Sequence, residues 1–320
     1  MLTSLKNSCN SIINEKKIYS AISLLDAEYT LFEDPLFCPY QVLIVNDEHP
    51  VSIVEKGRQI GYSHVTAFRA VYKAASNKKD TVYMSYNRES AKDFMRDVQK
   101  WCRIFNLTYS IFQEECIDKN SINIFECSFL NLRKIIAVSG DCTNLRGKPG
   151  ADVIIDEACY NPNPIEDILA ASMATLIHGG TVRIGSTHAG VDSDFHKLIE
   201  RVKSGELPYK HIKVTFKEAV KQGLYKRICA KKKDVWTQEK EDIWIAEIYK
   251  MYGNRASEEL DAEPSDYSQG GRIFNNFKYI DGVFDLLPYQ YIDFRYHDLA
   301  ATADKEDLQD SIYYSASVKI

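Results

Sequence analysis

The sequence predicts an α/β fold in which a mostly parallel sheet is flanked by helices. Short apolar runs recur at residues 51–54, 134–140, 151–157 and 181–187, and they are nearly continuous, as buried parallel strands are. A further run at 81–86 is β-branched and aromatic, and an amphipathic helical pattern follows it. Strands that alternate with helices favour a parallel sheet covered on both faces.

Length and composition fit this fold class. At 320 residues and 45% hydrophobic, the chain has room for one large core and a smaller second unit. No run approaches the roughly 20 apolar residues of a membrane span, and the first residues lack a signal pattern, so we expect a cytoplasmic protein without a membrane partner. The net charge of −5 disfavours coating of nucleic acid through bulk charge. The basic run 225–233 is either a local basic surface or, more commonly, a solvated face.

The eight cysteines include no C-x-x-C pair, which argues against a zinc site and a disulfide framework. We interpret them as reduced, mostly buried thiols.

The chain divides into four predicted segments. Residues 1–35 have a helical pattern of mixed polarity, and residues 36–265 contain the predicted strands, a helix capped by Asn87 and a polar helical stretch from about 234 onwards. Ser, Gly and Asn gather in 266–290, which is typical of a linker, and 291–320 begins a new strand that ends in an acid.

The stretch "KGRQIGYS", which begins at Lys56, has the outline of a phosphate-binding loop after a strand. Tyr62 stands where the pattern G-x-x-x-x-G-K-[ST] has its lysine. Phosphates need inward backbone N–H groups and a cation, but electrostatics does not fix where that cation is attached. Either Lys56 or Arg58 can supply it, and Ser63 keeps the hydroxyl that binds Mg²⁺. The alternative is an ordinary turn.

Two later strands end in polar residues suited to the same chemistry. In "VIIDEA", Asp156 is placed to hold Mg²⁺ through water and Glu157 to polarise an attacking water, although a buried strand can also simply end in surface acids. In "IGSTHAG", Ser186 or Thr187 can hydrogen-bond the γ-phosphate or Glu157, or can mark only a turn.

Two residues outside these strands are further candidates. The amide of Gln41 matches adenine N6 and N7 bidentately, and Arg146 can meet phosphate or DNA. The alternatives are an exposed glutamine and a loop arginine.

These motifs together resemble the large terminase subunits of tailed bacteriophages, which are ATP-driven DNA-packaging motors. "KGRQIGYS" resembles their displaced-lysine loop, and "LRGKPGADVIIDEA" resembles their acidic motif. "GSTHAG" resembles their coupling motif, usually Ser-Thr-Pro, with His188 in place of proline. "EELDAEPSDYSQGGRIF" and "RYHDLAAT" resemble the connection to, and the first strand of, the ribonuclease-H-like nuclease of Mu-like prophage terminases.

The resemblance implies an additional-strand P-loop (ASCE/RecA-like) ATPase that uses ATP and Mg²⁺ to package double-stranded DNA in the cytoplasm of a bacterial host. Its partners would be a portal protein, a small terminase subunit and further copies in a ring. The implied roles are phosphate binding by Lys56 and Arg58, metal binding by Ser63 and Asp156, general base for Glu157, adenine recognition by Gln41, coupling by Thr187, and nucleotide contacts from Gly57, Gln59, Gly61 and Tyr62.

For the nuclease, the resemblance implies that Asp298 is the first metal-binding acid, and the similarity extends to Asp310. Because a two-metal nuclease needs several acids from different strands, we expect this part to be incomplete and inactive. Two rival hypotheses are a non-catalytic remnant that binds nucleotide or partner proteins, and a helicase-like ATPase. The latter would need a second RecA-like domain, for which the chain has no room.

Overall fold

The computed structural model describes residues 37–115, 123–139 and 142–265. The chain divides into two compact units, Met1–Arg272 and Ile273–Ile320, and the described residues all belong to the first. The predictions for residues 1–35, for the 266–290 linker and for 291–320, with Asp298 and Asp310, lie outside the described residues.

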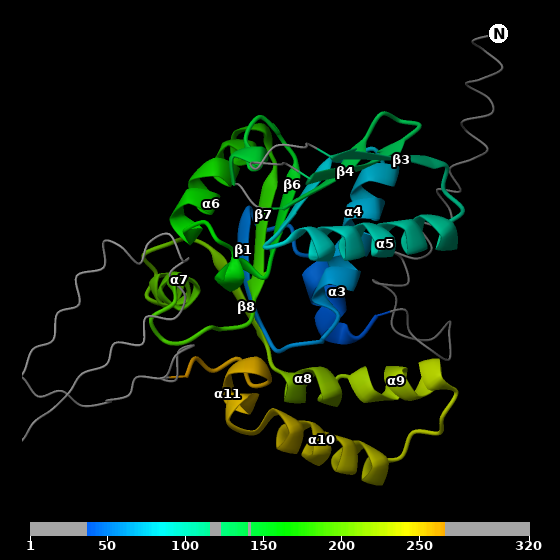
Figure 1. The fold of residues 1–320 in the computed structure, drawn as a ribbon, viewed down its shortest axis with the longest axis vertical. Helices are drawn as coiled ribbons and strands as arrows, with labels where there is room; N and C mark the ends of the chain where they lie inside the picture. Colours follow the sequence, from blue (N-terminus) through cyan, green and yellow to red (C-terminus); the bar gives the residue numbers. More distant parts are fainter. Residues whose placement is uncertain (1–36, 116–122, 140–141, 266–320) are drawn as a thin grey trace, which may run out of the picture. The chain divides into compact units, whose positions relative to one another are not determined.

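A single sheet organises this unit (Figure 1). Its strands are β1 (Val51–Lys56), β2 (Thr81–Ser85), β3 (Tyr109–Glu115), β4 (Asn123–Phe129), β5 (Lys134–Ser139), β6 (Asp152–Asp156), β7 (Thr181–Ser186) and β8 (Lys210–Val214). They lie in the order β3-β4-β5-β2-β6-β7-β1-β8. Only the pairs β3–β4 and β4–β5 are antiparallel, so the predicted mostly parallel sheet is confirmed.

The position of β7 decides the fold class. It lies between β1, which leads into the glycine loop, and β6, which ends in Asp156. This is the additional strand of the predicted class. The register pairs Asp156 with Gly185 and Glu55 with Ser186, so all three strands end at the same edge. Topology therefore brings three segments together that are far apart in the sequence. They are the glycine loop (57–61), the acids Asp156 and Glu157, and the Ser-Thr segment, which is Ser186 and Thr187.

Helices cover both faces of the sheet (Figure 1). They are α3 (Pro39–Val45), α4 (Tyr62–Ala75), α5 (Arg88–Ile104), α6 (Ile165–Met173), α7 (Asp194–Lys203), α8 (Phe216–Lys221), α9 (Leu224–Lys232), α10 (Gln238–Tyr252) and α11 (Ala256–Glu259), with short 3₁₀ turns η1 (Cys142–Leu145), η2 (Ala158–Tyr160), η3 (Ala174–His178) and η4 (Gly253–Arg255). The residues of α3, α4 and α5 pack in one core layer, and those of α6 and α7 pack in the other. Alternation along β6 supplies both layers, with Ile154 in the first and Val153 and Ile155 in the second.

Local sequence explains the helix starts. The side chain of Asn87 accepts a hydrogen bond from Ser90 N at 2.8 Å, which confirms the predicted cap of α5. The buried face of α5 is made by the predicted apolar residues Ala91, Phe94, Met95, Val98, Trp101 and Cys102. Helices α8 to α11 form a smaller cluster around Phe216 and Leu260. No helix among the described ranges is long and apolar enough to cross a membrane.

Strands β3, β4 and β8 are not predicted by the sequence pattern. In β8, "KHIKV" buries only Ile212 and Val214, so its apolar signal is short. In β3, "YSIFQEE" mixes polar and apolar residues at the edge of the sheet. The cysteines of the described part are buried apart from Cys159, which agrees with the predicted mostly buried thiols.

At the start of β6, the end of the strand that lies away from the loop, a buried carboxylate holds three elements together. Asp152 on β6 is fully buried and accepts from Arg69 Nε on α4 at 2.7 Å and from the hydroxyl of Thr181 on β7. Burial alone would raise the pKa of Asp152, but the charges of Arg69 and Arg183 and these hydrogen bonds outweigh it and lower the pKa to about 2. The ionised carboxylate therefore stabilises the fold.

Replacing this carboxylate tests that conclusion. We expect Asp152→Asn to lower the free energy of unfolding at pH 7 by about 3–5 kcal/mol, because the buried charge of Arg69 would lose its nearest carboxylate and keep only the exposed Glu48 at 3.6 Å. A depressed pKa gives stability that is present above the ordinary value and is lost as pH falls towards about 2. The variant should therefore differ less from the wild type near pH 3 than at pH 7 in urea unfolding. An equal difference at both pH values would contradict the assignment.

Candidate functional site

The glycine loop is fixed at its front by close backbone contacts. Gly57 N donates to Val214 O at 2.8 Å, and a Cβ built on Gly57 would lie 2.7 Å from Leu260 O, so no other residue fits without displacement. Gln59 and Gly61 both have positive φ, 61° and 83°. Gly61 is the N-cap of α4 and has no side chain to occupy the first-turn N–H groups, which are left available for an anion.

Lys56, the last residue of β1, reaches the acids of β6. Its Nζ lies 2.8 Å from Glu157 Oε1 and 3.7 Å from Asp156 Oδ1, and the residue is 4% exposed. Burial alone would lower the pKa of Lys56, but the charges of Asp156 and Glu157 outweigh it and raise the pKa. A charged ammonium therefore stands at the front of the loop, where the sequence predicts a displaced lysine.

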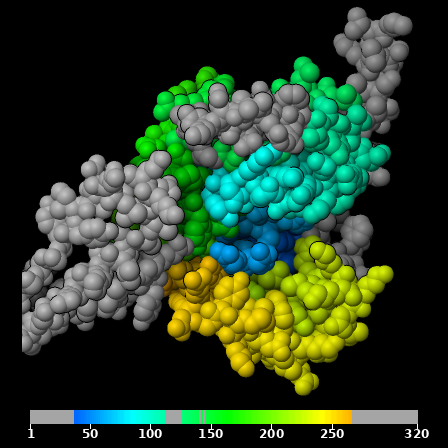
Figure 2. All heavy atoms as spheres, viewed as in Figure 1, coloured from blue at the N-terminus to red at the C-terminus, as the bar shows by residue number. Residues whose placement is uncertain are grey.

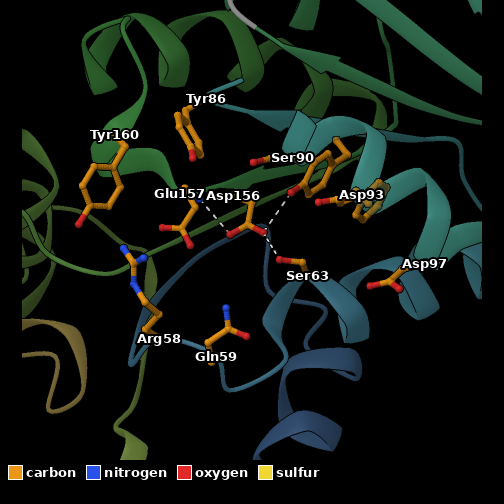
Figure 3. A pocket seen from close by; sticks show the side chains of 12 residues that line it. Arg58, Gln59, Ser63, Tyr86, Ser90, Asp93, Asp97, Asp156, Glu157 and Tyr160 are labelled. Atoms are coloured by element: carbon orange, nitrogen blue, oxygen red, sulfur yellow. Dashed lines mark hydrogen bonds between the residues drawn. The ribbon is translucent and has the colours of Figure 1, made fainter. Parts of the chain in front are cut away.

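Asp156 joins the back of the loop to β6. Its Oδ2 accepts from Ser63 Oγ at 2.5 Å and from Tyr83 OH at 3.1 Å (Figure 3). Burial and the nearby charge of Asp156 raise the pKa of Tyr83 well above its ordinary value, so the phenol stays a donor. Ser63 and Asp156 are therefore adjacent, as the sequence predicts for two residues that share a metal ion.

Glu157 has a strained backbone conformation. Its φ is 52°, in the left-handed region that non-glycine residues rarely adopt. While Oε1 accepts from Lys56, Oε2 is buried and has no hydrogen-bond partner among the described residues. One oxygen of this carboxylate is thus oriented by a cation, and the other is available to accept a proton.

A cavity of about 360 Å³ opens beside these residues. Figure 3 shows Arg58 and Gln59 from the loop on one side, Tyr86 and Tyr160 on another, and Ser90, Asp93 and Asp97 of α5 opposite. In Figure 2 the blue atoms of the segment that leads into the loop lie between the cyan atoms of α4 and α5 and the yellow atoms of the later helices.

Tyr62 packs against the sheet and is not among the residues that line the cavity. It is 3% exposed, and a Cβ built on Gly185 of β7 would lie 2.4 Å from its Cζ. The Nζ of Lys56 lies 5.5 Å from the centroid of the same ring. The tyrosine thus fills the position of the usual loop lysine with an aromatic ring, and Gly185 makes room for it.

Gln41 lies behind the loop, and it is not among the cavity-lining residues. Its Nε2 donates to Ile60 O at 3.1 Å, and its Oε1 accepts from Cys38 N at 3.0 Å and from Arg227 of α9 at 3.2 Å. In this structure the amide supports the loop backbone. Adenine recognition by Gln41 stays a prediction.

Arg58 pairs with Glu259 of α11. Its Nε lies 2.5 Å from Glu259 Oε2 of α11, and its backbone N donates to Glu259 O at 2.6 Å. The side chain is 42% exposed and still lines the cavity. Lys56 and Arg58 therefore differ in the structure, since the first contacts the acids and the second holds α11.

The Ser-Thr segment contacts the turn that follows Glu157. Ser186 Oγ accepts from Cys159 N at 3.1 Å, and Thr187 Oγ1 lies 3.2 Å from Tyr160 OH. Both hydroxyls thus lie next to the residues after the acid, which leaves the predicted coupling role open. Arg146 is exposed and is not among the cavity-lining residues.

Sequence reasoning missed the α5 wall of the cavity. Ser90, Asp93 and Asp97 follow helical spacing and so share one face, next to the apolar face that the pattern did predict. Tyr83 and Tyr160 were also missed, because nothing in a strand or turn pattern marks a tyrosine as facing a site. The contact of Glu259 with Arg58 joins residues 201 apart and has no local signal.

The donor set suits Mg²⁺. Mg²⁺ takes hard oxygen ligands, and it keeps waters and substrate phosphates in its coordination shell. The hydroxyl of Ser63 and the carboxylate of Asp156 are such oxygens in mutual contact. Across the described ranges, no group of three or more His, Cys, Asp or Glu side chains is arranged to hold a metal ion. The residues therefore fit a cation held jointly with phosphates.

The additional strand, the glycine loop before α4 and the acids at the end of β6 define a P-loop NTPase fold. Sequence comparison finds two related phage proteins. The Mu-like prophage FluMu protein gp28 of Haemophilus influenzae is 35% identical over 217 residues, 66% of this chain. The probable terminase large subunit gp28 of Escherichia phage Mu is 32% identical over 234 residues, 70% of this chain. Over these residues the chain is similar to the probable terminase large subunit of phage Mu and to its Mu-like prophage counterpart, and the predicted resemblance is confirmed.

The chain spans 42% of the length of each of these relatives. No protein-family model matches it. Among solved structures, the large terminase ATPase domain of Thermus phage P74-26 is similar with a TM-score of 0.46 and 16% identity, over 76% of this chain and 96% of that one.

The packing of Tyr62 on Gly185 gives a stability prediction. We expect Gly185→Ala to lower the free energy of unfolding by about 1–3 kcal/mol, because the new methyl group would overlap the ring. In the Tyr62→Ala background the same change should cost less, since the overlapping atoms are gone. Urea unfolding of the two single variants and the double variant measures this coupling. Additive free energies would show that the two residues are not in contact.

Proposed function

We propose that this chain is the ATPase part of a large terminase subunit, which hydrolyses ATP to drive double-stranded DNA into a phage capsid. The observation that carries the proposal is the buried ammonium of Lys56 at 2.8 Å from Glu157 at the front of a glycine loop. A glycine loop at the start of a helix, a cation and a carboxylate with one unpartnered oxygen are suited to phosphoryl transfer.

The roles follow from the contacts. Residues 59–61 and the start of α4, with Tyr62, would bind the phosphates through backbone N–H groups. The N–H groups of Gly57 and Arg58 instead hold the front of the loop to Val214 and Glu259. The ammonium of Lys56 would exchange Glu157 for a phosphate oxygen. Glu157 Oε2 would then accept the proton of the attacking water.

Ser63 and Asp156 would hold Mg²⁺, which when bound neutralises charge on the phosphates. Gln41 would support the loop or contact adenine, and Thr187 would report the state of the site through Tyr160. Arg58 would either stay on Glu259 or move to phosphate.

This role requires four partners: double-stranded DNA, a portal protein, a small terminase subunit and further copies of the chain in a ring. It would be carried out in the cytoplasm of the bacterial host. The name of the phage Mu relative as a probable terminase large subunit supports this assignment. The rival is a remnant that binds nucleotide without hydrolysing it. Single-turnover hydrolysis of ATP separates the two, because a remnant would retain ATP and release no phosphate.

Replacing the proposed base tests the reaction directly. We expect Glu157→Gln to lower turnover by roughly 10²–10⁴-fold, the usual effect of a lost general base, while ATP binding persists. Phosphate release and equilibrium nucleotide binding measure the two properties. Asp97→Asn, on the far wall of the same cavity, is a matched control for loss of one negative charge. Unchanged turnover in Glu157→Gln would move the catalytic role to another residue.

A second test compares the two loop cations. We expect Lys56→Ala to reduce ATP hydrolysis severely, because the site loses the buried ammonium next to Glu157. Arg58→Ala should reduce it less, since the Arg58 side chain is engaged with Glu259 and 42% exposed. Glu259→Gln, which removes the charge that pairs with Arg58 and keeps the arginine, is the control. If Arg58→Ala is inactive and Lys56→Ala is close to wild type, the arginine is the phosphate ligand.

A further inference from the structure

A buried carboxylate next to the loop takes no part in the proposed chemistry. Glu55 directly precedes Lys56 in β1, and successive strand side chains point to opposite faces, so Glu55 lies behind the site. It is 1% exposed. A buried carboxylate is costly unless it is paired, so its partners show what it connects.

Three cationic or donor groups surround Glu55. His188 Nε2 lies 2.8 Å from Oε1, His211 Nε2 lies 2.7 Å from Oε2, and Lys213 Nζ lies 3.5 Å from Oε1. Burial alone would raise the pKa of Glu55, but the hydrogen bonds from both histidines and the charge of Lys213 outweigh it and hold the pKa well below its usual range. An ionised carboxylate only accepts, so each Nε2 carries the donated proton.

The two histidines belong to different parts of the fold. His211 lies on β8, beside β1 in the sheet. His188 follows the Ser-Thr segment of β7, at the position where the resemblance predicts proline, and it is fully buried. Proline has no side-chain donor, so the contact with Glu55 is specific to the histidine.

From His188 the contacts lead back to the site. The hydroxyl of Tyr160 donates to His188 O at 3.0 Å and lies 3.2 Å from Thr187 Oγ1. Tyr160 is three residues after Glu157, and Glu157 contacts Lys56. Three contacts, Lys56 with Glu157, Tyr160 with His188 and His188 with Glu55, therefore form a closed circuit. The chain itself makes the other two links, from Glu157 to Tyr160 and from Glu55 to Lys56.

We propose that Glu55 and His188 form a positioning pair that sets the Ser-Thr segment relative to Lys56 and Glu157. The proposal rests on the proposed ATP hydrolysis for its kinetic consequence. A shift of Lys56 towards phosphate moves the end of β1, and the Glu55–His188 hydrogen bond transmits that shift to the segment after β7. His211 shares the carboxylate but not the circuit, which makes it a matched control.

The test compares His188→Leu, His188→Gln and His211→Leu in the full chain. Leucine removes the hydrogen bond to Glu55, whereas the glutamine amide reaches about as far as Nε2 and keeps a donor. We expect His188→Leu to lower kcat by about tenfold, since small displacements of reacting groups are costly, with KM for ATP within about twofold. His188→Gln should recover most of kcat, and His211→Leu should stay within about twofold of wild type.

Hydrogen exchange gives a readout that does not depend on turnover. Peptides that cover 56–63 and 157–160 should exchange faster in His188→Leu than in wild type, His188→Gln or His211→Leu. Equal exchange and equal kcat in the two leucine variants would overturn the positioning role. If the variants differ in exchange as expected but the wild-type protein releases no phosphate, only the proposed function is contradicted.

If His188→Leu does not fold, the comparison rests on His188→Gln. Reduced kcat and fast exchange in His188→Gln would also overturn the positioning role.

Discussion

The ammonium of Lys56 between two carboxylates is the contact on which the arrangement of the site depends. It ties the end of β1 to the end of β6 across the intervening β7, with Nζ 2.8 Å from Glu157 and 3.7 Å from Asp156. A buried and a half-buried carboxylate that share one ammonium would repel each other without it. The same ammonium is therefore a structural counter-ion in this conformation and the proposed phosphate ligand, and one role must yield for the other to begin.

The two glycines near this contact lie where a side chain would overlap neighbouring atoms. Gly57 lies against the backbone of Leu260 and Phe216, and Gly185 lies against the ring of Tyr62. Moving the lysine from the start of α4 to the end of β1 thus goes together with an aromatic residue at position 62 and a glycine on β7. A change at Lys56 alone would remove the charge, and a side chain at position 185 alone would overlap the ring of Tyr62.

The sequence predicts the parts of this site that are short and local. A strand that ends in Lys56, a strand that ends in Asp156 and Glu157, and a strand that ends in Ser186 each have an apolar run followed by polar residues, and parallel pairing brings those ends together. The sequence does not predict Glu259 for Arg58, Ile60 for Gln41, or Glu55 for His188, because these pairs depend on how distant segments approach. Strands β3 and β8 were missed for a related reason, since edge strands bury too little to give a continuous apolar run.

The contacts between the loop and α11 also decide whether the sheet and its loop can be separated from the helices that follow β8. Arg58 takes both a backbone and a side-chain partner from Glu259, and Phe216 N donates to Leu260 O at 2.8 Å beside Gly57. A fragment cut after β8 would retain the whole sheet and every residue of the glycine loop, yet it would lose the carbonyl that holds Arg58 N. A piece of this protein that keeps these loop contacts therefore extends through α11, and the four helices after β8 belong to the same compact unit as the sheet.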